Sequence, residues 1–83
     1  MKSSTFIIEN TSADDVTLYV EPEGHVVALA PQESVVVKDE FDKAAVVVRL
    51  SKELDGAMAL SIWPGDGDTM VLKDGKDVLN DFM

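Results

Sequence analysis

The chain contains no cysteine and only one histidine, His25, among its 83 residues. The lack of cysteine excludes disulfide bonds and Cys-rich zinc sites. One imidazole cannot build a zinc or copper centre, so we expect no metal ion and no other cofactor. No Gly-x-Ser-x-Gly element occurs and the one histidine directly follows a turn, so we assign no catalytic residue and expect a protein that is not an enzyme.

Basic residues are also scarce. Seven Lys and Arg stand against 16 Asp and Glu, which gives a formal net charge of −9. Because binding to nucleic acids or anionic membranes depends on Lys and Arg to neutralise phosphate, the composition predicts neither kind of partner. The acidic surface favours solubility and discourages strand edges from pairing, and it would attract a basic protein.

Long hydrophobic runs are missing as well. The apolar run near the N-terminus, in residues 5–9, is too short for the core of a signal peptide or for a membrane span. We therefore expect a soluble, cytoplasmic protein. A chain of this length forms one domain, residues 1–83, whose hydrophobic core must hold the fold without covalent help.

The chain does contain a series of short β-branched and aliphatic runs that end at Gly, Pro or Asp-rich turns. Their two-residue alternation is typical of strands. A helix over 52–59 fits the composition but is rejected, because Asp55-Gly56 is a turn dipeptide and the residues after it alternate. Strands are predicted at residues 5–9, 16–21, 25–29, 34–38, 44–50, 57–63, 68–73 and 77–79.

Short strands joined by tight turns predict an all-β fold. We expect a small antiparallel β-sandwich of about seven strands, with a partly open β-barrel as the alternative. The apolar tail residue Phe82 is expected to pack on the body of the domain. The side chains expected to face the core are Phe6, Ile8, Val16, Leu18, Val20, Val35, Val37, Val46, Val48 and Leu50.

Three stretches between residues 10 and 34 share a pattern of turns: Asn10-Thr11-Ser12, Val20-Glu21-Pro22-Glu23-Gly24, and Leu29-Ala30-Pro31-Gln32-Glu33-Ser34. An Asn-rich turn, a strand ending in Glu-Pro, a Gly, and then Pro-Gly before an acidic residue resembles the N-terminal part of a family of small bacterial all-β proteins of unassigned function. Gln32 stands where that pattern has Gly. The resemblance covers about a third of the chain. It implies a bacterial all-β fold and no activity or site.

The outward-facing residues form the main candidate for a binding surface. Tyr19 and Glu21 alternate with the core residues of one strand, and Trp63 ends another strand just before the loop that carries Asp66 and leads to Asp68. If these strands are neighbours, aromatic and acidic side chains gather on one surface suited to a protein partner. The alternative is that Trp63 fills the end of the core.

Three functions remain open besides that of a small enzyme, for which the sequence shows no catalytic constellation. The favoured one is a protein-binding or assembly module, including a homo-oligomer formed through edge strands or through the face that carries Val36 and Val47. The second is an acidic inhibitor or immunity-type protein that neutralises a basic partner. The third is a calcium-binding β domain, because residues 66–68 and 74–77 place four carboxylates in neighbouring loops. Asp beside Gly is also ordinary turn chemistry, which we favour over calcium.

Overall fold

The computed structural model describes residues 1–78, and that part of the chain contains strands and no helix. The all-β prediction is therefore confirmed, as is the rejection of a helix over 52–59, where one strand ends, turns and leads into the next. No described segment is a helix that could cross a bilayer. The strands are β1 (Lys2–Glu9), β2 (Val16–Val20), β3 (His25–Leu29), β4 (Ser34–Phe41), β5 (Val47–Lys52), β6 (Met58–Trp63), β7 (Asp68–Lys73) and β8 (Lys76–Asp77).

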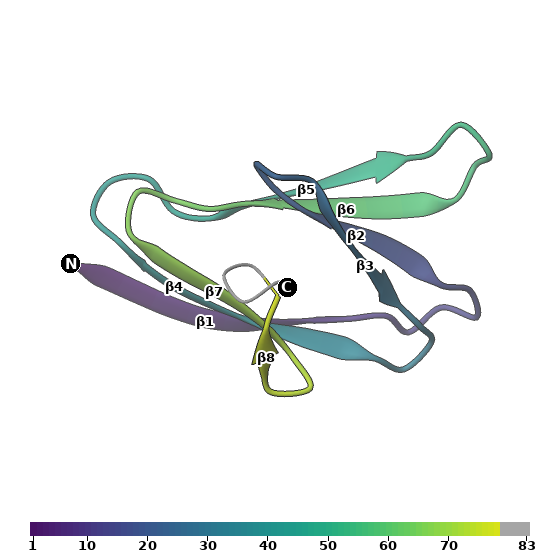
Figure 1. Cartoon of the computed structure of the whole chain (residues 1–83), viewed down its shortest axis with the longest axis horizontal. Coiled ribbons are helices and arrows are strands. Elements are labelled where there is room, and N and C mark those ends of the chain that lie inside the picture. The colour runs from purple at the N-terminus through teal and green to yellow at the C-terminus, as the bar shows by residue number, and fades with distance from the viewer. Residues whose placement is uncertain (79–83) are drawn as a thin grey trace.

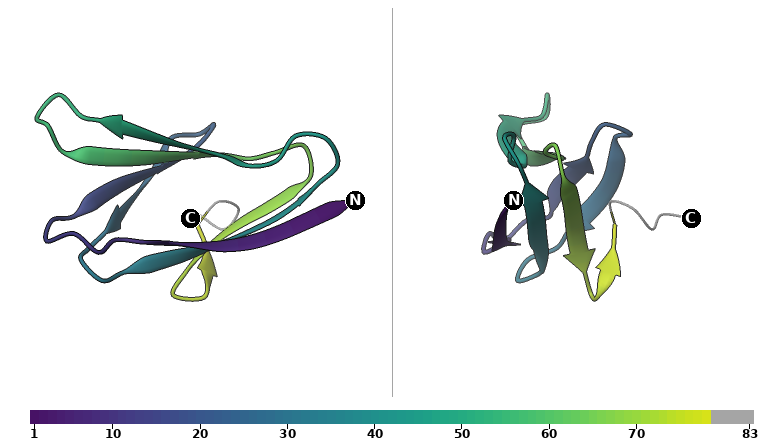
Figure 2. Two further views of the ribbon diagram at one scale, coloured as in Figure 1. Left: turned by 180° about the vertical axis from the view of Figure 1, so that it is seen from behind. Right: turned by 90° about the vertical axis from the view of Figure 1, so that its left-hand side faces the viewer.

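Two four-stranded sheets pack face to face without closing into a barrel, which confirms the predicted sandwich (Figure 1). Sheet A has the order β1-β4-β7-β8, and sheet B has the order β3-β2-β6-β5. The pair β2 and β6 runs parallel, and the other paired strands are antiparallel. The edge strands β1 and β5 lie on the same side of the sandwich (Figure 2).

The core lies between the sheets and is made of aliphatic side chains at alternate strand positions. The alternation predicted for β2 and for the first half of β4 is confirmed, since Leu18, Val20, Val35 and Val37 are fully buried. Phe6, Ile8, Val16 and Val46 pack against this core while half-buried. The buried cluster consists of Leu18, Val20, Leu29, Val35, Val37, Ile62 and Val71.

Val48 and Leu50 lie on the inner face of sheet B as predicted, but they are not buried. Val48 is 38% exposed and Leu50 is 68% exposed, and every residue of β5 is exposed. Both side chains share a face of sheet B with core residues, since Leu50 pairs with Leu60 and Val48 pairs with Ile62. They remain exposed because β5 is an edge strand. An inward-facing side chain there has a neighbouring strand on one side only, and its other side is open to solvent.

The strand predicted at 34–38 is too short, because β4 continues to Phe41 through residues expected to form a link. Asp39 follows Val35 and Val37 in the two-residue period and is only 1% exposed. Its carboxylate accepts hydrogen bonds from the Val46 backbone N–H at 2.9 Å and from the Thr69 hydroxyl at 2.8 Å. A buried carboxylate needs such donors to offset the loss of water.

The predicted strand at 44–50 begins later, at Val47. The backbone N–H groups of Ala44 and Val46 donate to the carboxylates of Asp66 and Asp39. These N–H groups therefore donate to side chains and not to the backbone of a neighbouring strand. At the other end of the chain β8 ends at Asp77, and the predictions for Leu79 and Phe82 lie outside the described residues.

The two ends of the sandwich differ. At one end the β4–β5 and β6–β7 connections run side by side between the sheets (Figure 1). Glycine is required there, because a Cβ at Gly65 would meet the Ala44 carbonyl and one at Gly67 would meet the Glu40 carbonyl. At the other end the sheets spread apart, and the β1–β2 loop and the β5–β6 hairpin lie opposite each other (Figure 1). We call these the closed end and the open end.

Candidate functional site

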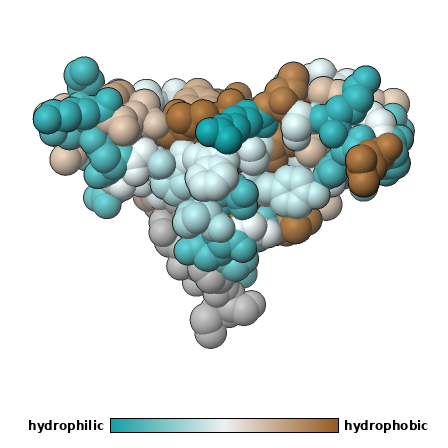
Figure 3. All heavy atoms as spheres, turned by 90° about the horizontal axis from the view of Figure 1, so that it is seen from above, coloured by the Kyte–Doolittle hydropathy of each residue, from teal (hydrophilic) through white to brown (hydrophobic). Residues whose placement is uncertain are grey.

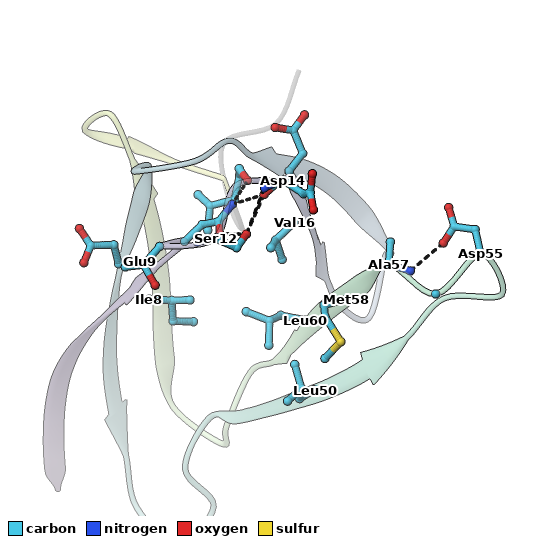
Figure 4. Close-up of a pocket in the computed structure, with 15 residues that line it drawn as sticks. Ile8, Glu9, Ser12, Asp14, Val16, Leu50, Asp55, Ala57, Met58 and Leu60 are labelled. Atoms are coloured by element: carbon cyan, nitrogen blue, oxygen red, sulfur yellow. Dashed lines mark hydrogen bonds between the residues drawn. The ribbon is translucent and has the colours of Figure 1, made fainter.

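A groove of about 610 Å³ lies at the open end of the sandwich. Its walls come from both sheets, with Ile8 and Glu9 of β1 on one side and Leu50 of the β5 edge on the other. Figure 4 shows the side chains of Ile8, Leu60 and Val16 directed toward the space between the walls. The volume falls within the range of about 300–1,000 Å³ that is usual for ligand sites.

The inside of the groove is apolar and incompletely covered. Leu50 is 68% exposed and Met58 is 40% exposed, although both lie in strands of a sandwich. Ile8, Val16 and Leu60 are half-buried beside them. Apolar area left in contact with water inside a hollow is the surface from which a ligand gains most when it displaces that water.

The rim of the groove is acidic. Glu9, Asp14, Asp15 and Asp55 all line it, and all four residues are exposed. Among the described residues that form the groove there is no Lys, Arg or His. The groove therefore combines an apolar interior with a negatively charged rim. This arrangement favours a ligand that carries both apolar groups and positive charge.

Asn10 fixes the wall formed by the β1–β2 loop. It is 5% exposed, and its Nδ2 donates to the carbonyls of Asp14 and Leu29, each at 2.8 Å. Its Oδ1 accepts from the Ser12 backbone N–H at 3.0 Å and from the Ser12 hydroxyl at 2.7 Å. These four bonds use the amide's full capacity and hold the loop in place before any ligand arrives.

The opposite wall is held by the β5–β6 hairpin. The Glu53 N–H donates to the Ala57 carbonyl at 2.7 Å, and the Ala57 N–H donates to Asp55 Oδ1 at 2.9 Å (Figure 4). The Tyr19 hydroxyl donates to Glu53 Oε1 at 2.6 Å, which ties the hairpin to β2. This hydrogen bond to a carboxylate raises the pKa of Tyr19 above its usual value.

The predicted surface residues Tyr19 and Trp63 lie on neighbouring strands of sheet B and on its outer face. Tyr19 pairs with Ser61, and Trp63 follows the fully buried Ile62 and so points the opposite way. The Arg49 guanidinium lies 5.5 Å from the centre of the Trp63 ring. Trp63 is thus half-buried on the outside instead of filling the core. Figure 3 views this side: residues of intermediate hydropathy occupy its middle, hydrophobic residues lie along the upper border and at the right, and hydrophilic residues lie toward both ends.

The acidic members of the predicted set have different surroundings. Glu21 continues β2, where its N–H donates to the Ile62 carbonyl at 2.9 Å. Asp66 turns back onto its own end of the sandwich and accepts backbone N–H bonds from residues 42–44. Asp68 lines a second hollow of about 470 Å³ together with Glu23 and Glu40.

The described residues contain no group of three or more His, Cys, Asp or Glu side chains that could hold a metal ion. The two Asp–Gly loops considered for calcium serve as turns. In the β7–β8 hairpin both Asp74 and Gly75 have positive φ, 54° and 80°. This is the backbone conformation of a type I′ turn, for which Asp-Gly is a favoured sequence.

Comparison with protein-family models, with curated proteins and with solved structures finds no match to this chain. The groove therefore carries the functional argument by itself. Its apolar residues were visible in the sequence, but alternation places them on an inner face and does not tell whether that face is covered. The one available signal was the alternation at Leu50 and Leu60, which put large apolar side chains on two successive strands.

Proposed function

We propose that the protein is a non-enzymatic protein-binding module whose open-end groove takes a basic, partly apolar segment of a partner protein. One observation carries the proposal: uncovered apolar side chains, Leu50 and Met58 among them, lie inside a rim whose charged residues are all acidic. Each half of this arrangement selects one property of the segment. Together they favour a chain that carries apolar residues next to Lys or Arg.

The two parts contribute in different ways. Full burial of a Leu side chain stabilises a complex by about 1.5–3 kcal/mol, so covering Leu50 supplies affinity. The carboxylates at Glu9, Asp14, Asp15 and Asp55 are exposed and therefore screened by salt. They speed the encounter with a basic partner and disfavour acidic ones.

The shape of the site suits a polypeptide. The groove is bordered by β1 and β5, which are the edge strands on one side of the sandwich. An extended chain can enter from that side without separating the sheets. Hydrogen bonds already hold the walls around Asn10 and Glu53 in place, so these segments lose little conformational entropy when a ligand binds.

The test uses a peptide with the sequence KKLSLSLKK and two matched peptides, KKSSSSSKK without the leucines and EELSLSLEE with the charge reversed. We expect the first peptide to bind more tightly than either control in a fluorescence or calorimetric titration at physiological salt. Leu50→Ser should weaken its binding by about tenfold or more. Because Leu50 is mostly exposed, the variant should keep the melting temperature of the parent within a few degrees.

Leu54→Ser is the matched control. Leu54 is fully exposed near the tip of the β5–β6 hairpin and does not line the groove. The same chemical change there should leave binding unaltered. Equal weakening by both variants would show that the peptide does not bind in the groove. Equal binding of the leucine and serine peptides would show that general charge attraction drives binding.

A further inference from the structure

Strand β5 is an open edge at the border of the groove. It pairs with β6 over six consecutive positions, from Val47 with Trp63 to Lys52 with Met58. Within residues 1–78 no strand pairs with its other side. An edge of this kind presents a row of backbone N–H and C=O groups that can pair with another chain.

β5 contains no Pro and no Gly, and its register with β6 has no bulge. Its charged residues are Arg49 on the outer face and Lys52 at the end of the strand. The other edges are less inviting. β8 has two residues, β1 begins with Lys2 and three hydroxyl residues, and β3 runs between the turns of Pro22 and Pro31. β5 is therefore a regular, exposed stretch of edge beside the groove, and an edge of this kind can accept an extended segment of another protein as an added strand.

The inner face of β5 leads into the groove. Leu50 pairs with Leu60, and both side chains line the cavity. A strand added beside β5 would lie about 4.8 Å from it, and its alternate side chains would point to that same face. They would enter the space between Leu50 and Ile8 of the opposite sheet. The outer face differs, because Arg49 lies there over Trp63.

We propose that the partner segment binds by strand addition: it pairs with β5 through main-chain hydrogen bonds as a fifth strand of sheet B and seats alternate apolar side chains in the groove. The inference rests on the proposed function and specifies its geometry. The occupant is an extended segment of a basic partner, with apolar residues at alternate positions and Lys or Arg at its ends. The acidic rim favours this occupant over a second copy of a chain whose net charge is −9.

The experiment compares KKLSLSLKK with two versions of it that carry backbone N-methyl groups. One is methylated at the amides of two leucines, and the other at the amides of the two serines. In a strand these two sets of N–H groups point to opposite sides, so only one set can face β5. We expect one methylated peptide to lose binding by about tenfold or more while the other binds within about threefold of the parent. The β5 amides that point away from β6 should also become protected from hydrogen exchange when the parent peptide is bound.

Each other outcome overturns the inference in a distinct way. If both methylated peptides bind like the parent, or both lose binding equally, the segment does not pair with β5, and the proposed function stands on the parent peptide alone. If the parent peptide does not bind, both proposals fail. A doubled solution mass, together with slow hydrogen exchange in the free protein at the β5 amides that point away from β6, would assign this edge to a second copy of the chain.

Discussion

At the scale of single residues, the turn after β3 contains the most informative departure from a simple pattern. Gln32 has φ +70°, in the left-handed region that favours glycine. Its N–H donates to the Asn10 carbonyl at 2.7 Å, and the Glu33 N–H donates to the Ala30 carbonyl at 3.0 Å. The turn therefore holds the Asn10 wall of the groove and carries local backbone strain.

Replacing this residue with glycine should stabilise the fold. A left-handed conformation costs a residue with a Cβ about 1–2 kcal/mol, and glycine avoids this cost. Glycine also loses more backbone entropy on folding, which offsets about 0.5–1 kcal/mol of the gain. We expect Gln32→Gly to raise the free energy of unfolding by up to about 1 kcal/mol, measured by urea denaturation. Gln32→Ala keeps the Cβ and should bring no such gain. A less stable Gly variant would contradict this explanation of the turn.

Sequence reasoning at this scale succeeds where a residue's environment follows from alternation alone. It places Leu18, Val20, Val35 and Val37 correctly in the core. It misses Asp39, although that residue continues the same two-residue period, because a carboxylate is buried only where donors from distant parts of the chain meet it. Those donors are fixed by tertiary structure and leave no local signal.

At the scale of elements, Asp66 fastens the two connections that form the closed end. Its Oδ1 accepts from the Asp42 N–H at 2.9 Å, and its Oδ2 accepts from the N–H groups of Lys43 and Ala44 at 2.9 and 3.0 Å. In return the Asp66 N–H donates to the Ala44 carbonyl at 2.8 Å. The bonds to Asp42, Lys43 and Ala44 lower the pKa of the Asp66 carboxyl below its ordinary value of 3.8.

This lowered pKa makes part of the stability dependent on pH. The ionised carboxylate is favoured in the folded state, so its contribution is complete above the unfolded-state pKa of 3.8 and is lost as pH falls through the lower folded-state pKa. Asp66→Asn should lower the melting temperature at pH 7. The difference between the variant and the parent should shrink as pH falls below 3.8.

Asp68→Asn is the matched control for this prediction, because it removes the same charge at an exposed position two residues further along the chain. It should leave the melting temperature at pH 7 nearly unchanged. An Asp68→Asn variant that loses as much stability as Asp66→Asn would assign the effect to net charge. A gap between Asp66→Asn and the parent that stays constant with pH would exclude ionisation of Asp66 as its cause.

The elements themselves were largely predictable, because strands and hairpin turns follow from local alternation and from Asp-Gly or Pro-Gly chemistry. The turns at 22–24 and 74–75 both occur where the sequence indicates them. The pairing of β2 with β6 was not predictable, since it joins strands far apart in the chain and in parallel. This pairing places Tyr19 and Trp63 on one face of sheet B.

At the scale of the whole molecule, the net charge and the open end fit together. An exposed edge such as β5 invites self-association, and a charge of −9 on every copy opposes it. The same charge is compatible with a basic partner. One closed end and one open end therefore divide the sandwich into a part that holds the sheets together and a part that is free to bind.

The most direct test of the groove is a map of backbone amide chemical-shift changes when KKLSLSLKK is titrated into isotope-labelled protein. We expect the largest changes to cluster in β5, in the hairpin residues 55–58 and in the loop 9–15, with little change at the closed end around Asp66. Small changes spread evenly over the acidic surface, or changes centred on the outer face at Tyr19 and Trp63, would contradict binding in the groove.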